Sequence, residues 1–144
     1  MTKNIEFFTE DTELKVSERT IRTWLTTILT QEYSYQSYVI NYIFCSDEYL
    51  HAINVDYLQH DTYTDIITFP LEVTDNHISS DIFISVDRIR ENAKEYHTTE
   101  HNELLRVMAH GLLHLFGMND KTDDEKKKMR LRESQLIELY DDQY

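Results

Sequence analysis

The chain has 144 residues, and its 27 Asp and Glu against 14 Lys and Arg give a formal net charge of −13 at pH 7. This length suits one domain with a substantial core. So acidic a composition lacks the basic surface typical of nucleic-acid-binding proteins. Cys45 is the only cysteine, which excludes an intrachain disulfide. The chain starts without an apolar signal segment and has no run of about 18 apolar residues, so we expect a soluble cytoplasmic protein with no membrane contact.

The first part of the chain predicts alternating strands and helices. Residues 4–8 predict a strand, and β-branched and aromatic side chains predict a second one over residues 36–45. Between them, apolar residues at i, i+3, i+4, i+7 and i+8 predict an amphipathic helix, namely Ile21, Trp24, Leu25, Ile28 and Leu29. Ser46 is a good N-cap for a further helix. We expect that helix to bury Leu50, Ile53, Tyr57 and Leu58.

The rest of the chain predicts a hairpin followed by three helices. A polar loop over residues 60–65 leads into strands at about 66–69 and 81–86, connected around Asp75 and Asn76. Helices follow at about residues 87–96, 100–116 and from the capping box Thr122–Glu125 to about Tyr140. This order predicts an α+β fold over residues 1–144. We expect a single domain in which a mixed sheet of about four strands packs against helices.

The helix at 100–116 contains the clearest functional signal. His110 and His114 are the only polar side chains in the run Val107–Phe116, and one unpartnered buried imidazole costs a few kcal/mol. Side chains four residues apart on a helix lie roughly 5–6 Å apart, so both rings can bind one cation. Gly117 then ends the helix and lets the chain return with Asp120. The pattern predicts a zincin-like metal helix that binds one Zn²⁺ through three ligands and leaves a fourth position open.

The same spacing also occurs in another class of zinc enzyme. Metallopeptidases with the motif His-Glu-x-x-His-x-x-Gly-x-x-His/Asp place a glutamate beside the first histidine as the general base. Here that position is Gly111. A peptidase would therefore need a base from elsewhere in the chain, and this alternative stays open.

The histidine motif and three other segments resemble one known family. His110-Gly-Leu-Leu-His114-Leu-Phe-Gly117 resembles His-Gly-x-Leu-His-Leu-x-Gly-x-x-His, the signature of the YbeY family of bacterial endoribonucleases in ribosomal RNA maturation. The segments Ile53–Tyr57, Thr64–Pro70 and Asp81–Ser85 resemble the family's Leu-Asn-x-x-Tyr/Phe, Thr-Asp-Val-Leu-Ser-Phe-Pro and Gly-Asp-Ile-x-Ile. The match runs from about residue 45 to residue 135.

The resemblance implies a zinc-dependent endoribonuclease that cuts single-stranded RNA. It implies a role in maturation of the 3′ end of 16S ribosomal RNA and in ribosome quality control, with the small ribosomal subunit as partner. A zinc ion with an open position polarises a phosphoryl oxygen and lowers the pKa of its bound water toward 7. The residues expected in the cleft or behind the metal ligands are Asn54, Thr64, Asp65 and Asp81. A non-catalytic, zinc-stabilised ribosome-associated factor stays open as a further alternative.

Two positions depart from the family pattern. Asp120 stands where the family usually has histidine, and Leu58 stands where it commonly has arginine. A carboxylate is an ordinary zinc ligand, so the first change preserves metal binding while lowering the positive charge of the site. The second removes a phosphate contact, which then has to come from another cation. The candidates are Arg88, Arg90, Lys121 and Lys126, the last of which begins the basic run Lys126–Arg132. That run is either a solvated helix face or a surface that faces phosphate.

Overall fold

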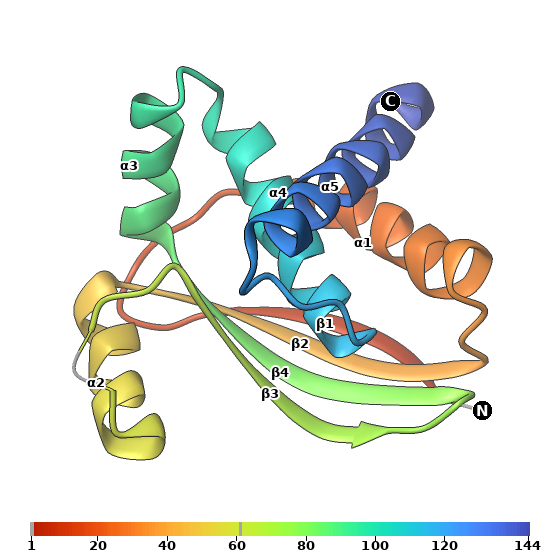
Figure 1. Ribbon diagram of the computed structural model, residues 1–144, viewed down its shortest axis with the longest axis horizontal. Coiled ribbons are helices and arrows are strands. Elements are labelled where there is room, and N and C mark those ends of the chain that lie inside the picture. Colours follow the sequence, from red (N-terminus) through yellow and green to blue (C-terminus); the bar gives the residue numbers. More distant parts are fainter. Residues whose placement is uncertain (1, 61) are drawn as a thin grey trace.

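The computed structural model describes residues 2–60 and 62–144. Its strands form one mixed sheet in the order β1-β2-β4-β3 (Figure 1). Lys3–Thr9 (β1) pairs in parallel with Ser37–Cys45 (β2), and β2 pairs in parallel with His77–Ser85 (β4). Ile66–Val73 (β3) lies at the edge, antiparallel to β4. The predicted α+β class and four-stranded mixed sheet are therefore confirmed.

The helices divide unequally between the two faces of the sheet. Figure 1 shows α1, α4 and α5 gathered over one face, while α2 lies on the other side at one end. Their bounds are Glu18–Thr27 (α1), Asp47–Leu58 (α2), Val86–Glu95 (α3), Glu100–Leu115 (α4) and Asp123–Gln143 (α5), with a π-helical turn, Ile28–Glu32 (η1), continuing α1. No helix in residues 2–60 and 62–144 is both long and apolar enough to cross a membrane.

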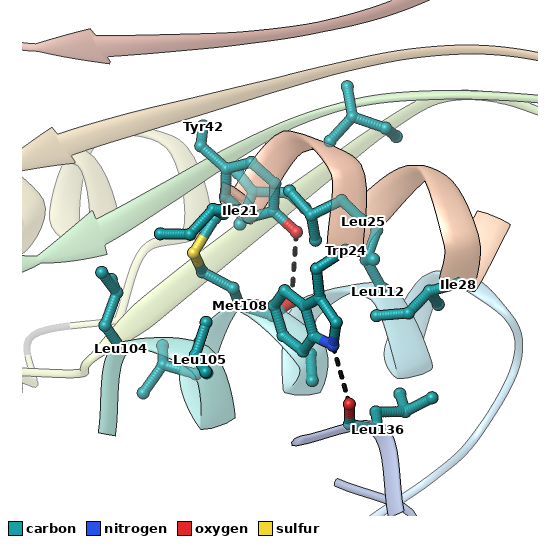
Figure 2. Close-up of a cluster of buried hydrophobic side chains, with 14 of the residues drawn as sticks. Ile21, Trp24, Leu25, Ile28, Tyr42, Leu104, Leu105, Met108, Leu112 and Leu136 are labelled. Carbon is teal, nitrogen blue, oxygen red and sulfur yellow. Dashed lines mark hydrogen bonds between the residues drawn. The ribbon is translucent and has the colours of Figure 1, made fainter. Parts of the chain in front are cut away.

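The main core lies between this helical layer and the sheet. Trp24 is fully buried, and its indole Nε1 donates a hydrogen bond to the Leu136 carbonyl oxygen at 2.7 Å (Figure 2). The buried Tyr42 hydroxyl donates to the Met108 carbonyl oxygen at 3.1 Å (Figure 2). Buried indole and phenol groups need such partners. The first bond connects α1 to α5 and the second connects β2 to α4, so the helix that contains the histidines is bonded directly to the sheet.

The predicted connections agree with the structure, and both strands of the hairpin extend further than predicted, with β4 beginning at His77 and not at about residue 81. The turn between β3 and β4 falls at Asp75 and Asn76, as predicted, and β3 continues to Val73 through an irregularity between Pro70 and Glu72. The side chain of Ser46 caps α2, and the capping box that begins α5 at Thr122 is present. The π-helical turn η1 was not predicted.

One expected buried stripe is wrong. Leu50 is buried in α2, but Tyr57 is 74% exposed and Leu58 is 42% exposed. The other buried residue of α2 is Asn54, one turn after Leu50. Ile53 is partly buried against the sheet, as predicted in part. The exposed Tyr57 ring keeps only an edge contact with Phe69, so the last turn of α2 lies mostly in water.

Cys45 provides a test of the packing at the end of β2. Its thiol is fully buried and donates to the Ile84 carbonyl oxygen at 3.6 Å, and burial raises the pKa of the thiol to about 12. Only the thiolate reacts readily with alkylating agents. We expect iodoacetamide to leave the native protein unmodified at neutral pH and to modify one site after denaturation, as measured by intact mass. Rapid modification of the native protein would contradict this packing.

Candidate metal centre

The two histidines lie where the chain leaves the core. Helix α4 ends at Leu115, and Gly117 has a φ of 99°, a left-handed conformation that favours glycine. The Gly117 N–H donates to the His114 carbonyl oxygen and the Met118 N–H to that of Leu113, each at 3.0 Å. This is the Schellman pattern of a helix end. The reversal brings Asp120 back toward the histidines, as the sequence predicted.

Three ligand atoms converge at this point. The Nε2 atoms of His110 and His114 lie 3.0 Å apart, and Asp120 Oδ2 lies 3.3 Å from the first and 3.4 Å from the second. Ligands about 2.0–2.1 Å from a tetrahedral zinc ion are separated by roughly 3.3 Å, so these spacings match three corners of such a site. The group could therefore hold one metal ion without rearrangement.

A second carboxylate fixes the orientation of His110 from behind. The His110 Nδ1 lies 2.7 Å from Glu133 Oε2, and Glu133 Oε1 accepts a hydrogen bond from Arg106 at 3.1 Å. The Glu133 side chain is only 6% exposed. Burial acts to lower the pKa of His110, but the hydrogen bond and charge of Glu133, together with the charges of Asp65 and Asp120, outweigh it, so that pKa is raised. A carboxylate in this place favours the tautomer with the proton on Nδ1, which leaves Nε2 free for a metal.

Two hollows meet at the three ligands. One, of about 270 Å³, is lined by residues of α3, α4 and α5, and the other, of about 480 Å³, opens toward β3. Asp65, His110 and Asp120 line both of them. Burial raises the pKa of Asp65. Thr64 lines the second hollow, so two of the four residues expected in the cleft lie beside the ligands.

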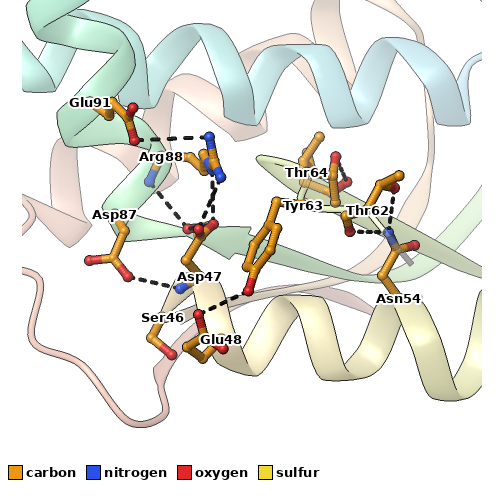
Figure 3. Close-up of polar contacts among 12 residues, drawn as sticks. Ser46, Asp47, Glu48, Asn54, Thr62, Tyr63, Thr64, Asp87, Arg88 and Glu91 are labelled. Atoms are coloured by element: carbon orange, nitrogen blue, oxygen red, sulfur yellow. Dashed lines mark hydrogen bonds and ion pairs between the residues drawn. The ribbon is translucent and has the colours of Figure 1, made fainter. Parts of the chain in front are cut away.

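The other two expected cleft residues lie elsewhere. The Asn54 amide donates to the Thr62 carbonyl oxygen at 2.8 Å and so ties α2 to the loop before β3 (Figure 3). Asp81 accepts a hydrogen bond from Asn41 at 3.0 Å and lines a separate groove beside α2. Strand side chains alternate between faces, and because Ile82 points into the core, Asp81 points to the opposite face.

The four cations proposed to contact phosphate also lie in different places. Arg88 forms a two-pronged ion pair with Asp47, at 3.0 and 3.1 Å, and lies over the ring of Tyr63 (Figure 3). Arg90 donates to a main-chain carbonyl oxygen, and Lys121 lines neither hollow. Lys126 lines the 270 Å³ hollow. Of the four candidates, Lys126 is therefore the one beside the metal ligands.

Glu133 and Arg106 belong to this site but were not among the residues predicted from the sequence. A signal for Glu133 was present, because it lies on the buried stripe of α5 among apolar residues, namely Met129, Leu136, Ile137 and Tyr140. A carboxylate in such a stripe needs a partner. That its partner is His110, 23 residues earlier, depends on how α4 and α5 pack.

The residue after His110 decides between two kinds of zinc hydrolase. A Cβ atom on Gly111 would lie 2.8 Å from Ile66 Cδ1 and 3.3 Å from Ile82 Cγ2, so this position faces the sheet. Gly111→Glu would create the peptidase motif in the sequence, but the new carboxylate would be forced into the core. We expect the variant to lose more than about 3 kcal/mol of unfolding free energy, measured by urea denaturation, and to gain no peptidase activity.

A matched control limits that interpretation. Gly111→Ala adds only a methyl group beside the end of a rotatable isoleucine side chain. We expect it to cost much less than the glutamate. Equal stability of Gly111→Glu and the unchanged protein would show that the helix does not pack this closely on the sheet.

The comparisons with known proteins agree with this arrangement. A family model described as Endoribonuclease YbeY matches residues 4–141. The Endoribonuclease YbeY of Cytophaga hutchinsonii is 51% identical over 138 residues, covering 95% of this chain and 96% of that protein. The Flavobacterium johnsoniae protein of the same name is 46% identical over 134 residues, covering 92% and 95%. The solution structure of TM1509 from Thermotoga maritima is similar, with a TM-score of 0.63, 25% identity, and coverage of 95% of this chain and 89% of that one. The chain belongs to the Endoribonuclease YbeY family.

Proposed function

We propose that this endoribonuclease is zinc-dependent and cleaves single-stranded RNA, acting in maturation of the 3′ end of 16S ribosomal RNA and in quality control of ribosomes in the cytoplasm. The observation that carries the proposal is the convergence of His110, His114 and Asp120 at the meeting point of two hollows. Two nitrogens and one carboxylate oxygen at tetrahedral spacing suit zinc. The small ribosomal subunit is the expected partner.

The chain's own residues position the reaction. When bound, zinc supplies a Lewis acid for a phosphoryl oxygen and acidifies a water molecule. His110 and His114 would hold it from one helix turn, and Asp120 from the segment before α5. Glu133 keeps the His110 ring oriented, and Asp65 lies in both hollows beside the ligands. His110 and Asp120 line both hollows, and a flexible single strand enters such hollows more easily than a duplex.

The two other functions have less support. Gly111 has no side chain to act as a peptidase base, and there is no room for one. A purely structural metal would be enclosed by four protein ligands, whereas this group offers three and borders two hollows.

The decisive experiment uses an RNA that carries the unprocessed 3′ end of 16S ribosomal RNA beside a stable hairpin. We expect metal-stripped protein to be inactive and added zinc to restore cuts in the single-stranded part only. His114→Ala should abolish cleavage while the circular dichroism spectrum stays unchanged. If zinc loading only raises the melting temperature and no RNA is cut, the metal is structural and the proposal fails.

A further inference from the structure

The basic run on α5 divides between two surfaces. Lys126 and Arg130 are one turn apart and both line the 270 Å³ hollow, whereas Lys127 and Lys128 lie outside that lining. Within residues 2–60 and 62–144, no ion pair or side-chain hydrogen bond holds Lys126 or Arg130. Their charges are therefore available to a bound molecule.

Lys126 and Arg130 are the two cations of the hollow that form no ion pair in the described residues. Its lining contains four carboxylates and three cations, namely Asp65, Glu103, Asp120, Glu133, Arg106, Lys126 and Arg130. Arg106 is already paired with Glu133. On a chain of net charge −13, a polyanion therefore has Lys126 and Arg130 as its attractive contacts beside the metal ligands. The lining of the second hollow contains no lysine or arginine, so phosphate is favoured on one side of the ligands only.

The lining of this hollow also contains an exposed aromatic ring. Tyr96 ends α3, lines the same hollow as the two cations and is 56% exposed. Helix α3 and helix α5 lie apart in Figure 1, on either side of α4. Proteins that bind single strands combine a cationic groove with aromatic rings on which bases stack. The hollow has both features.

We propose that the hollow between α3 and α5 is a nucleotide subsite for the RNA strand. Lys126 and Arg130 contact the phosphate next to the one that is cleaved, and Tyr96 stacks on the adjoining base. The subsite rests on the proposed function for the identity of its ligand. It would hold the strand more tightly on one side of the metal ligands, because the phosphates on that side meet cations and those on the other side do not.

The test measures binding without cleavage. In a His114→Ala background, the affinity for a fluorescent single-stranded RNA of about ten nucleotides is measured by anisotropy over a range of salt concentrations. We expect Lys126→Gln with Arg130→Gln to weaken binding roughly tenfold at low salt. The slope of log affinity against log salt should fall by about 0.7 for each lost contact. The matched control is Lys127→Gln with Lys128→Gln, which removes the same charge from the same helix and should leave the slope unchanged.

The salt dependence of RNA binding distinguishes the contribution of Tyr96 from that of the two cations. Tyr96→Ala should weaken binding with no change of slope, and Tyr96→Phe should restore it, because stacking needs the ring and not the hydroxyl. The subsite is overturned if the Lys126/Arg130 variant and the Lys127/Lys128 variant change the salt slope equally, or if the protein binds no RNA at low salt. If the unsubstituted protein cleaves RNA but the pairs do not differ, the subsite is wrong and the proposed function stands. If the unsubstituted protein does not cleave RNA but the two double variants differ in slope, the subsite stands and the proposed function is wrong.

Discussion

Replacing Asp120 by alanine is expected to lower zinc affinity by more than about 100-fold, above the 10–100-fold range typical of losing an outer partner of a ligand. Asp120 supplies one of three ligand atoms, and it is the only one that carries a negative charge. Two imidazoles one helix turn apart would remain, a much weaker site. Competition with a chromophoric chelator measures the affinity, and total zinc per chain gives the stoichiometry.

The fold should survive this change. Asp120 lies in the segment between α4 and α5, its side chain is 36% exposed, and its charged contacts are with the two histidines. We therefore expect the metal-free variant to unfold at the same urea concentration as the metal-free parent. Asp123→Ala removes a nearby exposed carboxylate outside the ligand group and serves as the control. Full zinc content and unchanged affinity without Asp120 would remove it from the site.

Much of this centre could be predicted because its signals are local. The histidines are one helix turn apart, and Gly117 marks a helix end whose geometry depends on a few adjacent hydrogen bonds. The same holds for the caps at Ser46 and Thr122, where a side chain bonds a main-chain N–H three residues later. Local periodicity and local capping are set by neighbouring residues, so one sequence is enough to predict them.

The features that could not be predicted from the sequence depend on contacts between segments that are distant along the chain. Glu133 meets His110 only because α5 packs on α4, and Arg88 is held by Asp47 because α3 begins beside the start of α2. The position of Asp81 was predictable in principle, since the alternation along β4 places it opposite Ile82. The exposure of Leu58 was not, because it depends on where α2 leaves the sheet.

Glu133→Gln is expected to weaken zinc binding by about 10–100-fold, although Glu133 is not a ligand in the group. The substitution keeps the size of the side chain but removes the charge that polarises the His110 ring, and it leaves the Arg106 cation without its partner. Glu103→Gln is the matched control, because Glu103 is equally buried and lines the same hollow. Burial raises the pKa of Glu103, and no histidine is bonded to it in the described part of the chain. A general effect of removing buried negative charge would weaken zinc binding in both variants.

A second measurement separates orientation of the ring from loss of stability. In the metal-free protein burial lowers the pKa of His110, but the hydrogen bond and charge of Glu133, together with the charges of Asp65 and Asp120, hold that pKa above its ordinary value. A histidine of this kind stabilises the fold fully below its unfolded pKa, about 6.5, and that contribution is lost as pH rises through the folded value. Glu133→Gln leaves the burial and removes the largest opposing contribution, so the pKa of His110 should fall and the stabilisation below that pH should decrease. Nitrogen-15 shifts of the ring follow both the pKa and the share of the tautomer with the proton on Nδ1. If the pKa and the tautomer stay unchanged while zinc affinity falls, Glu133 does not act through the His110 ring.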